Sequence, residues 1–479
     1  MDEAKHFIDG AWCAPASGAT LAVIDPSDGE AFARIARGTA ADIERAVHAA
    51  RRAYEGAWGA LSAAERGRVL ARLGLLVARD QEALAQLESR DTGKPLRQAR
   101  ADAAALVRYF EFYAGAADKL HGETLPYQAG YTVLTVREPH GVTGHIVPWN
   151  YPMQIFGRSA GAALAAGNAC VVKPAEDACL SLLRVAALAQ EAGLPPGALN
   201  IVTGLGHEAG AALASHPGID HISFTGSPQT GRLVAQMAGE HYVPVTLELG
   251  GKSPQIVFAD ADFDQALPFL VGAIVQNAGQ TCSAGSRVLI ERAAYEPLLE
   301  RLAAAFEALR VGPAPADLDC GPLISEKQRQ RVRAFLDEAH SAGIPTLARG
   351  RLVAGAPRGG YYEVPALLRD VPPQSRLAQQ EVFGPVLAAM PFEGEDAAIA
   401  LANGTPYGLV AGVWTRDGAR QLRIARRVRA GQVFVNNYGA GGGVELPFGG
   451  TGQSGHGREK GFEALYGFTV LKTIALRHG

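Results

Sequence analysis

Cys282 is the residue of this chain best suited to act as a nucleophile. It follows an apolar, helix-like stretch and precedes a β-rich run, so we expect it at a connection between elements, where functional side chains gather. The thiolate is the attacking form, and a free cysteine has a pKa of about 8.5, so a catalytic Cys282 needs surroundings that favour ionisation. The alternative is a small buried apolar residue, the usual place of an isolated cysteine.

Glu248 is a candidate general base. Residues 245–252 read VTLELGGK, which places this carboxylate between two leucines at the end of an expected strand. Burial there is costly without a partner, and it raises the pKa of the carboxyl towards the range of a general base. Gly250 and Gly251 would let a ligand or backbone approach closely. The alternative is a strand residue that points outwards.

Asn150 is a candidate donor to a developing negative charge on oxygen. Residues 147–152 read VPWNYP, which predicts a turn between a strand and a helix. A side-chain amide aimed at an oxyanion is a large catalytic contribution. An asparagine at such a turn can equally cap the helix, and composition does not separate the two.

A second group of residues could bind a dinucleotide. Lys173 and Glu176, in VKPAE at 172–176, follow a strand. The lysine could reach a ribose hydroxyl or a phosphate. The glutamate could accept a hydrogen bond from a ribose 2′-hydroxyl and would repel a 2′-phosphate, which favours NAD over NADP. The alternative is an ordinary salt bridge on the surface.

The glycine pattern for a dinucleotide is weak. Residues 204–210 read GLGHEAG, which has one residue too many for the G-x-G-x-x-G fingerprint. Residues 224–227 read FTGS and open another helix, whose N-terminal amides could face a phosphate.

Composition excludes several other classes of protein. Hydrophobic residues are 48% and charged residues 19%, which is typical of a globular chain. A formal net charge of -3 argues against a nucleic-acid partner. Five irregularly spaced cysteines give no disulfide framework, and the absence of C-x-x-C, H-E-x-x-H, EF-hand and P-loop motifs predicts no metal. The polar start and the lack of a long apolar run predict a cytoplasmic protein without a signal peptide or membrane contact.

The periodicity predicts which elements position these residues. Helices are expected within 39–53, 62–87 and 101–117, and a strand over 131–136. Strand–helix alternation then predicts βαβ units and parallel sheets, with a second series over 255–430. In the first series, the expected strands are 142–147, 169–172, 200–202, 221–224 and 245–249, and the expected helices are 153–166, 179–192, 207–215 and 229–238.

Several motifs together resemble those of the NAD(P)-dependent aldehyde dehydrogenase superfamily. The resemblance extends from about residue 7 to residue 474, and chance agreement at seven motifs in the family's order is negligible. The motifs are PWN at 148–150, KPAE at 173–176, FTGS at 224–227, LELGGK at 247–252, GQTC at 279–282, EVFGP at 381–385 and PFGG at 447–450.

The resemblance implies an α/β fold with three parts. An atypical Rossmann dinucleotide-binding domain, which needs no glycine fingerprint, would comprise residues 1–120 and 138–247. An α/β catalytic domain would comprise 248–447. A small β oligomerisation arm with the C-terminal tail would comprise 121–137 and 448–479, and would pair subunits in a homodimer or homotetramer.

The resemblance also implies roles for individual residues. Cys282 would be the nucleophile, Glu248 the general base, and Asn150 the oxyanion donor together with the N–H of Cys282. Residues expected to contact the cofactor are Ile146, Trp149, Asn150, Lys173, Glu176, Gly206, Ser227, Leu249, Glu381 and Phe383. Residues expected to line the substrate pocket are Tyr151, Gln154, Ile155, Arg158, Thr281, Ser283, Tyr438 and Glu445.

The expected reaction is oxidation of an aldehyde to a free acid, with NAD as cofactor and NADP as the alternative. Family members that pass the acyl group to coenzyme A typically lack the glutamate at position 248. Many relatives that accept small aldehydes carry an aromatic residue at the position of Arg158, and the loop 437–445 has four glycines. These features predict a bulky aromatic or terpenoid aldehyde. Arg158 could instead attract a carboxylated semialdehyde; an amino aldehyde and a thiol-esterase side activity also stay open.

Overall fold

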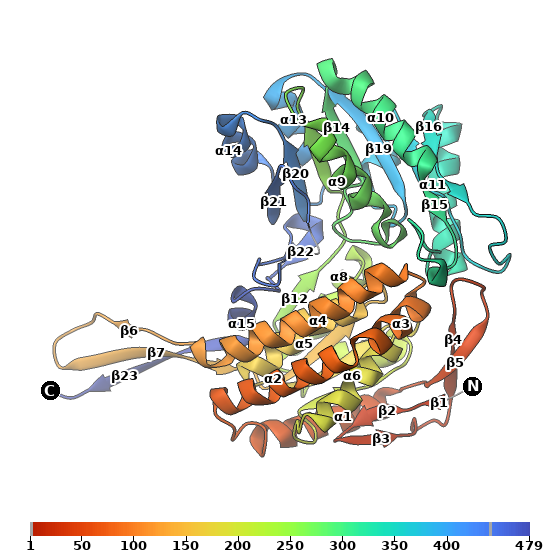
Figure 1. Cartoon of the computed structure of the whole chain (residues 1–479). Coiled ribbons are helices and arrows are strands. Elements are labelled where there is room, and N and C mark those ends of the chain that lie inside the picture. Colours follow the sequence, from red (N-terminus) through yellow and green to blue (C-terminus); the bar gives the residue numbers. More distant parts are fainter. Residues whose placement is uncertain (1–2, 440–442) are drawn as a thin grey trace.

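The computed structural model describes residues 3–439 and 443–479 as two α/β halves and a β arm that projects from the first half (Figure 1). Each half is built on its own sheet, with its own buried core. The fold class expected from the sequence is confirmed.

The first half is an eight-stranded sheet covered by helices. Its five central strands are parallel because helices connect them, and its other three pairings, one at one edge and two at the other, are antiparallel. The strand order is β22 (Gly455–His456), β12 (Val245–Glu248), β11 (His221–Thr225), β8 (Val142–Val147), β9 (Ala169–Pro174), β10 (Leu199–Ile201), β2 (His6–Ile8) and β3 (Ala11–Cys13). The helices are α1 (Ala40–Glu55), α2 (Ala63–Arg79), α3 (Gln81–Thr92), α4 (Leu96–Ala116), α5 (Pro152–Ala166), α6 (Leu180–Glu191), α7 (Ala211–Ala214), α8 (Pro228–Gly239) and α15 (Glu463–Gly467).

The helix expected within 62–87 is in fact two. Ser62 caps α2 by accepting a hydrogen bond from the N–H of Glu65, but α2 ends at Arg79 and α3 starts at Gln81. Asp80 separates them, and its carboxylate pairs with Arg79 and Arg184. The segment 207–215 also differs from the expected helix, because a π-helical turn at Gly206–Gly210 precedes the short α7.

The second half is a seven-stranded sheet that is parallel except at one edge. Its order is β16 (Thr346–Arg349), β18 (Ala366–Leu368), β19 (Val386–Phe392), β14 (Arg287–Glu291), β13 (Pro254–Val257), β20 (Val410–Trp414) and β21 (Gln432–Val435). Its helices are α9 (Phe263–Val275), α10 (Tyr295–Ala308), α11 (Glu326–Ser341), α12 (Arg376–Gln379), α13 (Gly394–Asn403) and α14 (Gly418–Arg427). A separate pair of short strands joins β15 (Arg310–Val311) to β17 (Arg351–Leu352).

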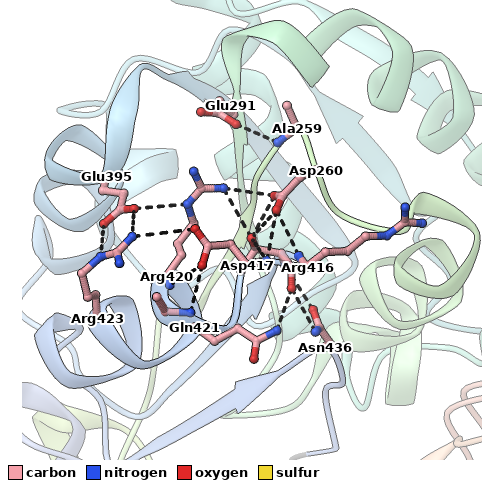
Figure 2. Close-up of polar contacts among 12 residues, drawn as sticks. Ala259, Asp260, Glu291, Glu395, Arg416, Asp417, Arg420, Gln421, Arg423 and Asn436 are labelled. Carbon is pink, nitrogen blue, oxygen red and sulfur yellow. Dashed lines mark hydrogen bonds and ion pairs between the residues drawn. The ribbon is translucent and has the colours of Figure 1, made fainter.

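An ion-pair network holds α14 against the end of β13 (Figure 2). Asp260 accepts hydrogen bonds from the N–H groups of Arg416 and Asp417, each at 3.2 Å, and from Arg420 at 3.1 Å. Glu395 of α13 binds both Arg420 and Arg423. The network lies on the surface of the second half and contains none of the expected site residues.

The arm consists of β6 (Thr124–Leu125), β7 (Tyr131–Pro139) and β23 (Thr469–Arg477). Strand β23 pairs with β7 along its whole length, and its other edge has no partner strand among the described residues. The preceding segment 455–468 packs on the first half, since β22 joins that sheet and Leu465 and Phe468 lie in its core, whereas Phe448 lies in a core of the second half. A small sheet near the N-terminus comprises β1 (Glu3–Ala4), β5 (Ala31–Ala36) and β4 (Thr20–Ile24).

Candidate active site

The turn that carries Asn150 meets the segment that carries Cys282 between the two halves. Asn150 follows β8 and precedes α5, and its Nδ2 donates to the main-chain oxygen of Gln280 at 3.0 Å. Gly251, just beyond β12, lies against the same segment, where a Cβ would come within 2.5 Å of the Cys282 oxygen. Only a glycine permits this approach, which brings the end of β12 next to the cysteine.

The segment before Cys282 has an unusual backbone. Helix α9 ends at Val275, and Asn277 and Ala278 then adopt positive φ angles of 49° and 52°. Such strain persists where surrounding bonds over-determine it. Here Asn277 Nδ2 donates to the Asn150 oxygen at 3.0 Å, and Gln280 Nε2 donates to the Asn277 oxygen at 3.1 Å.

The environment of Cys282 favours the thiol rather than the thiolate. Burial raises the pKa of Cys282 to about 11; the charge of Arg158 opposes this rise, whereas Glu381 and Glu248 add to it. The surroundings therefore do not by themselves ionise the sulfur, and a base must take its proton before it can attack.

Glu248 is buried at the end of β12. It is 1% exposed, and neither carboxylate oxygen has a hydrogen-bond partner among the described residues. Burial raises the pKa of Glu248 well above its usual range, and the charge of Arg158 opposes that rise. A carboxyl without hydrogen bonds and with a raised pKa is suited to accept a proton near neutral pH.

Arg158 is buried and does not line the large cavity of the structure. Its guanidinium forms an ion pair with Glu459 at 2.5 Å, donates to Thr225 Oγ1 at 3.2 Å, and lies 5.0 Å from the ring centroid of Phe448. Ser223 donates to the other oxygen of Glu459 at 2.6 Å. The charge of Arg158 is thus satisfied within the protein, and the residue is absent from the lining of the large cavity described below.

Three of the residues expected to contact the cofactor, Trp149, Glu381 and Phe383, form one group. The rings of Trp149 and Phe383 meet edge to face with 5.4 Å between their centroids. Glu381 Oε1 accepts a hydrogen bond from the N–H of Gly251 at 2.9 Å, and burial raises the pKa of this carboxyl to about 7. Phe383 has a positive φ of 61°, and Gln328 holds its main-chain oxygen at 2.7 Å.

Residues expected at the adenosine end form a second group. Lys173, at the end of β9, donates to Glu176 at 2.8 Å, and Glu176 also accepts from the main chain of Gly206. Ile146 lies beside Lys173 in the sheet register. Two further expected contacts play visible structural roles: Ser227 caps α8, and the N–H of Leu249 donates to the Ser454 oxygen at 3.2 Å.

These two groups fit a nicotinamide dinucleotide. A lysine–glutamate pair with an adjacent main-chain N–H suits a ribose and its phosphate, and a buried carboxylate beside aromatic rings suits the other ribose and a planar ring. The charge of Glu176 also opposes binding of a 2′-phosphate.

A cavity of about 840 Å³ opens between α4, α5 and α9. Four of the expected pocket residues line it: Gln154, Thr281, Ser283 and Tyr438. The remaining lining residues are Arg97, Gln98, Ala101, Asp102, Ala105, Leu267, Pro268, Phe269, Val271, Gly272, Ala273, Val275, Gln276, Ala305, Leu309, Asp319 and Gly439. Apolar side chains of α9 provide one wall, while amide and carboxylate groups of α4 and α5 provide the other.

The other expected pocket residues lie outside this lining. Tyr151 lies behind the lining residue Thr281, and the hydroxyls of the two residues share a hydrogen bond of 2.8 Å. Ile155 is buried in the core of the first half. Glu445 is exposed and pairs with Arg108. Residues 440–442 of the glycine-rich loop are not among those described.

A buried ionic cluster beside the site was not predicted from the sequence. Lys94 binds Glu88 and Asp102, and all three side chains are nearly inaccessible to solvent. Their spacing in a helical region is typical of solvated surface charges, so the sequence carried no sign of their burial. Among the described residues there is no cluster of side chains that could hold a metal, and no helix has both the length and the apolarity to span a bilayer.

Comparison with known proteins identifies the family to which the chain belongs. The family model for the aldehyde dehydrogenase family matches residues 12–474. The NADP/NAD-dependent aldehyde dehydrogenase PuuC of Escherichia coli is 44% identical over 98% of this chain and 95% of its own length. A crystal structure from Burkholderia cenocepacia, assigned to the aldehyde dehydrogenases, is 80% identical with a TM-score of 0.99, over 99% of this chain and 100% of its own.

The aldehyde dehydrogenase of Bacillus cereus, solved as a complex with NAD+, is 38% identical with a TM-score of 0.97, over 100% of this chain and 97% of its own. The chain therefore belongs to the aldehyde dehydrogenase family and is an NAD(P)-dependent aldehyde dehydrogenase.

Proposed function

We propose that this enzyme converts a bulky aldehyde to the free carboxylic acid through a thioester on Cys282. The observation that carries the proposal is the meeting of the Asn150 turn, the Cys282 segment and the buried, unbonded carboxyl of Glu248. The three residues supply the donor, the nucleophile and the base that this reaction needs.

The chemistry begins with loss of the thiol proton, which Glu248 accepts. The sulfur of Cys282 then bonds to the carbonyl carbon and forms a thiohemiacetal, whose oxyanion accepts hydrogen bonds from Asn150 Nδ2 and the Cys282 N–H. A bound nicotinamide supplies the acceptor for the hydride that leaves this carbon. Glu248 then releases the thiol proton to solvent, and its carboxylate takes a proton from water, which attacks the thioester. The C–S bond breaks, the acid leaves, and the departing sulfur takes this proton from Glu248, which restores the Cys282 thiol.

NAD is the cofactor that the site favours. Lys173, Glu176 and Gly206 would hold the adenosine ribose, while Trp149, Glu381 and Phe383 would hold the nicotinamide end. The carboxylate of Glu176 is held by Lys173 and disfavours a 2′-phosphate. NADP stays as the alternative, and comparing the KM of the two cofactors tests the preference.

Replacing Glu248 tests the proposed base. Glu248→Gln keeps the shape of the side chain but cannot take a proton, so we expect steady-state turnover to fall by about 100-fold or more. If release of the acyl group becomes limiting, NADH forms in a burst, and mass spectrometry of acid-quenched enzyme shows an acyl adduct on Cys282. Cys282→Ala should show neither turnover nor adduct. Full turnover by Glu248→Gln would contradict the proposal.

The cavity supports a large substrate. Its volume of about 840 Å³ and its apolar α9 wall suit an aromatic or terpenoid aldehyde. Arg158 is paired with Glu459, and Arg97, which lines the cavity, donates to the Asp317 oxygen at 2.6 Å. The guanidinium of Arg158 is therefore not free to bind the carboxylate of a semialdehyde, whereas Arg97 keeps further N–H donors. The two acids that line the cavity are already paired, Asp102 with Lys94 and Asp319 with Arg97 and Arg310, which disfavours an amino aldehyde.

A kinetic panel separates these substrates. We expect kcat/KM for benzaldehyde-sized or terpenoid aldehydes to exceed that for acetaldehyde and for carboxylated or amino aldehydes. The reverse order would refute the bulky substrate. Hydrolysis of an aryl ester without cofactor measures the thiol-esterase side activity.

We also propose that the arm pairs subunits. The unpartnered edge of β23 carries exposed apolar side chains, including Leu471, Ile474 and Leu476. Proteins usually cover such an edge, and pairing with a second copy of the chain in a homodimer or homotetramer would do so.

A further inference from the structure

A buried lysine holds the turn on which Asn150 sits. Lys94 follows α3 and is 1% exposed, and its ammonium donates to Glu88 Oε1 at 3.0 Å and to Asp102 Oδ2 at 2.5 Å. Its third bond, of 2.9 Å, goes to the main-chain oxygen of Asn150. An ammonium has three donors, so all of them are used, and the direction of the lysine is fixed.

The same cluster binds the chain on the far side of Asn150. Glu88 Oε2 accepts from the N–H of Met153 and from the Ser181 hydroxyl, each at 3.2 Å. Asp102 Oδ1 accepts from Gln154 Nε2 at 2.6 Å. The three ionic groups therefore hold the turn at residue 150 and the second and third residues of α5 beyond it.

The main-chain oxygen of Asn150 also accepts hydrogen bonds from both halves of the enzyme. It accepts from Lys94 of the first half and from Asn277 Nδ2 of the second, at 2.9 and 3.0 Å. The side chain of the same Asn150 donates to Gln280, two residues before Cys282. The peptide of Asn150 is thus fixed from both sides, while its amide faces the segment of the nucleophile.

A buried ionic cluster is an expensive way to build a core, because the desolvation of the charges often exceeds their attraction. Apolar side chains of similar volume would usually be at least as stable. We infer that Lys94 is a positioning residue: with Glu88 and Asp102 it sets the orientation in which Asn150 donates to the oxyanion formed at Cys282. This inference rests on the role proposed above for Asn150.

A double-mutant cycle tests the inference. Lys94→Met should lower kcat by on the order of 100-fold, since a small misplacement of a catalytic group can have that effect. Asn150→Ala should lower kcat by about 100-fold or more. If Lys94 acts through Asn150, the double variant should be no slower than Asn150→Ala. The KM of the cofactor should stay within a few-fold of wild type, and iodoacetamide should alkylate Cys282 at an unchanged rate without substrate.

Arg66→Met is the matched control. Arg66 is a partly buried cation of the first half that donates to the main-chain oxygens of Leu61 and Ala165, at 2.8 and 3.4 Å, with no bond to the Asn150 turn. We expect both Met variants to lower the unfolding temperature, but only Lys94→Met to lower kcat. Should Lys94→Met not fold, Asn277→Ala removes the other donor to the same oxygen and enters the same cycle.

The outcomes separate this inference from the proposed function. If Asn150→Ala slows turnover but its effect multiplies with that of Lys94→Met, Lys94 has only a structural role, and the inference is overturned alone. If Asn150→Ala keeps full activity, the proposed oxyanion donor fails, whatever Lys94 does. A drop in kcat for Lys94→Met that disappears in the Asn150→Ala background supports both.

Discussion

Burial and the nearby charge of Arg158 shift the pKa of the Glu248 carboxyl in opposite directions. Its burial raises the pKa, which helps it accept a proton, but a carboxyl that stays protonated cannot act as a base. Arg158 opposes the rise because its positive charge favours the ionised carboxylate, and Glu459 and Phe448 fix the guanidinium in place. The residue expected in the pocket thus has an electrostatic role in the structure.

Arg158→Met tests that role through pH. Without the nearby cation, the pKa of Glu248 rises further, and because the base works deprotonated, the acid limb of the kcat/KM profile should move to higher pH by about one pH unit. Arg158→Lys keeps the charge and should leave the limb near its wild-type position. An acid limb that does not move in Arg158→Met would show that the arginine does not act on the base.

The central strands of the first sheet carry histidines that are buried without charge. His145 of β8 and His221 of β11 lie against Phe468, and the ring of His221 stacks on His140 with 4.9 Å between centroids. Burial lowers the pKa of His145 to about 3 and holds that of His221 well below its usual value. The folded sheet therefore holds these imidazoles in their neutral form, and its free energy of unfolding should fall in acid.

The stability of this sheet should fall between pH 6.5 and 5. In that window the unfolded chain binds protons, at a pKa near 6.5, that the folded chain cannot bind until about pH 3 at His145. For this one residue, the loss in free energy of unfolding is roughly 2 kcal/mol. His145→Gln should therefore show a shallower fall of unfolding temperature with acid than wild type. Parallel curves would contradict the linkage.

In the molecule as a whole, the arm is the part whose sheet has a long strand edge with no partner among the described residues of the single chain. Apart from its first residue, β23 is exposed along its length, and it projects away from both halves (Figure 1). A long exposed edge strand with apolar side chains favours association. Asn150, Glu248 and Cys282, in contrast, are brought together within one chain.

Two charges on the arm should weaken assembly. Ile474→Glu/Leu476→Glu places carboxylates on one face of β23, where the side chains are 36% and 50% exposed. Light scattering after gel filtration should give a smaller particle for this variant than for wild type at the same concentration. Leu352→Glu, at another exposed leucine on β17, is the control and should leave the mass unchanged. Equal masses for all three would place the subunit contact elsewhere.

The sequence by itself determined the local structure and the chemical candidates. The alternation of apolar runs and helical stretches predicted the strands β8, β9, β11 and β12 and the helices α5 and α8 close to their observed bounds, because a period of two or of 3.6 residues depends only on neighbours along the chain. The motifs likewise indicated Cys282, Glu248 and Asn150. The N-terminal strands that extend the first sheet were not predicted; they are short, and β2, which attaches them to the sheet, pairs with β10 almost 200 residues away.

Only the tertiary structure decided what surrounds each candidate. It buried Lys94 among two acids beneath Asn150, paired Arg158 with a glutamate 301 residues later, and left Glu248 without a hydrogen bond to any described residue. Burial, charge compensation and pKa depend on groups brought together from distant parts of the chain, and no spacing in the sequence encodes them. For this protein, residue types indicated the chemistry, and packing determined which charges support it.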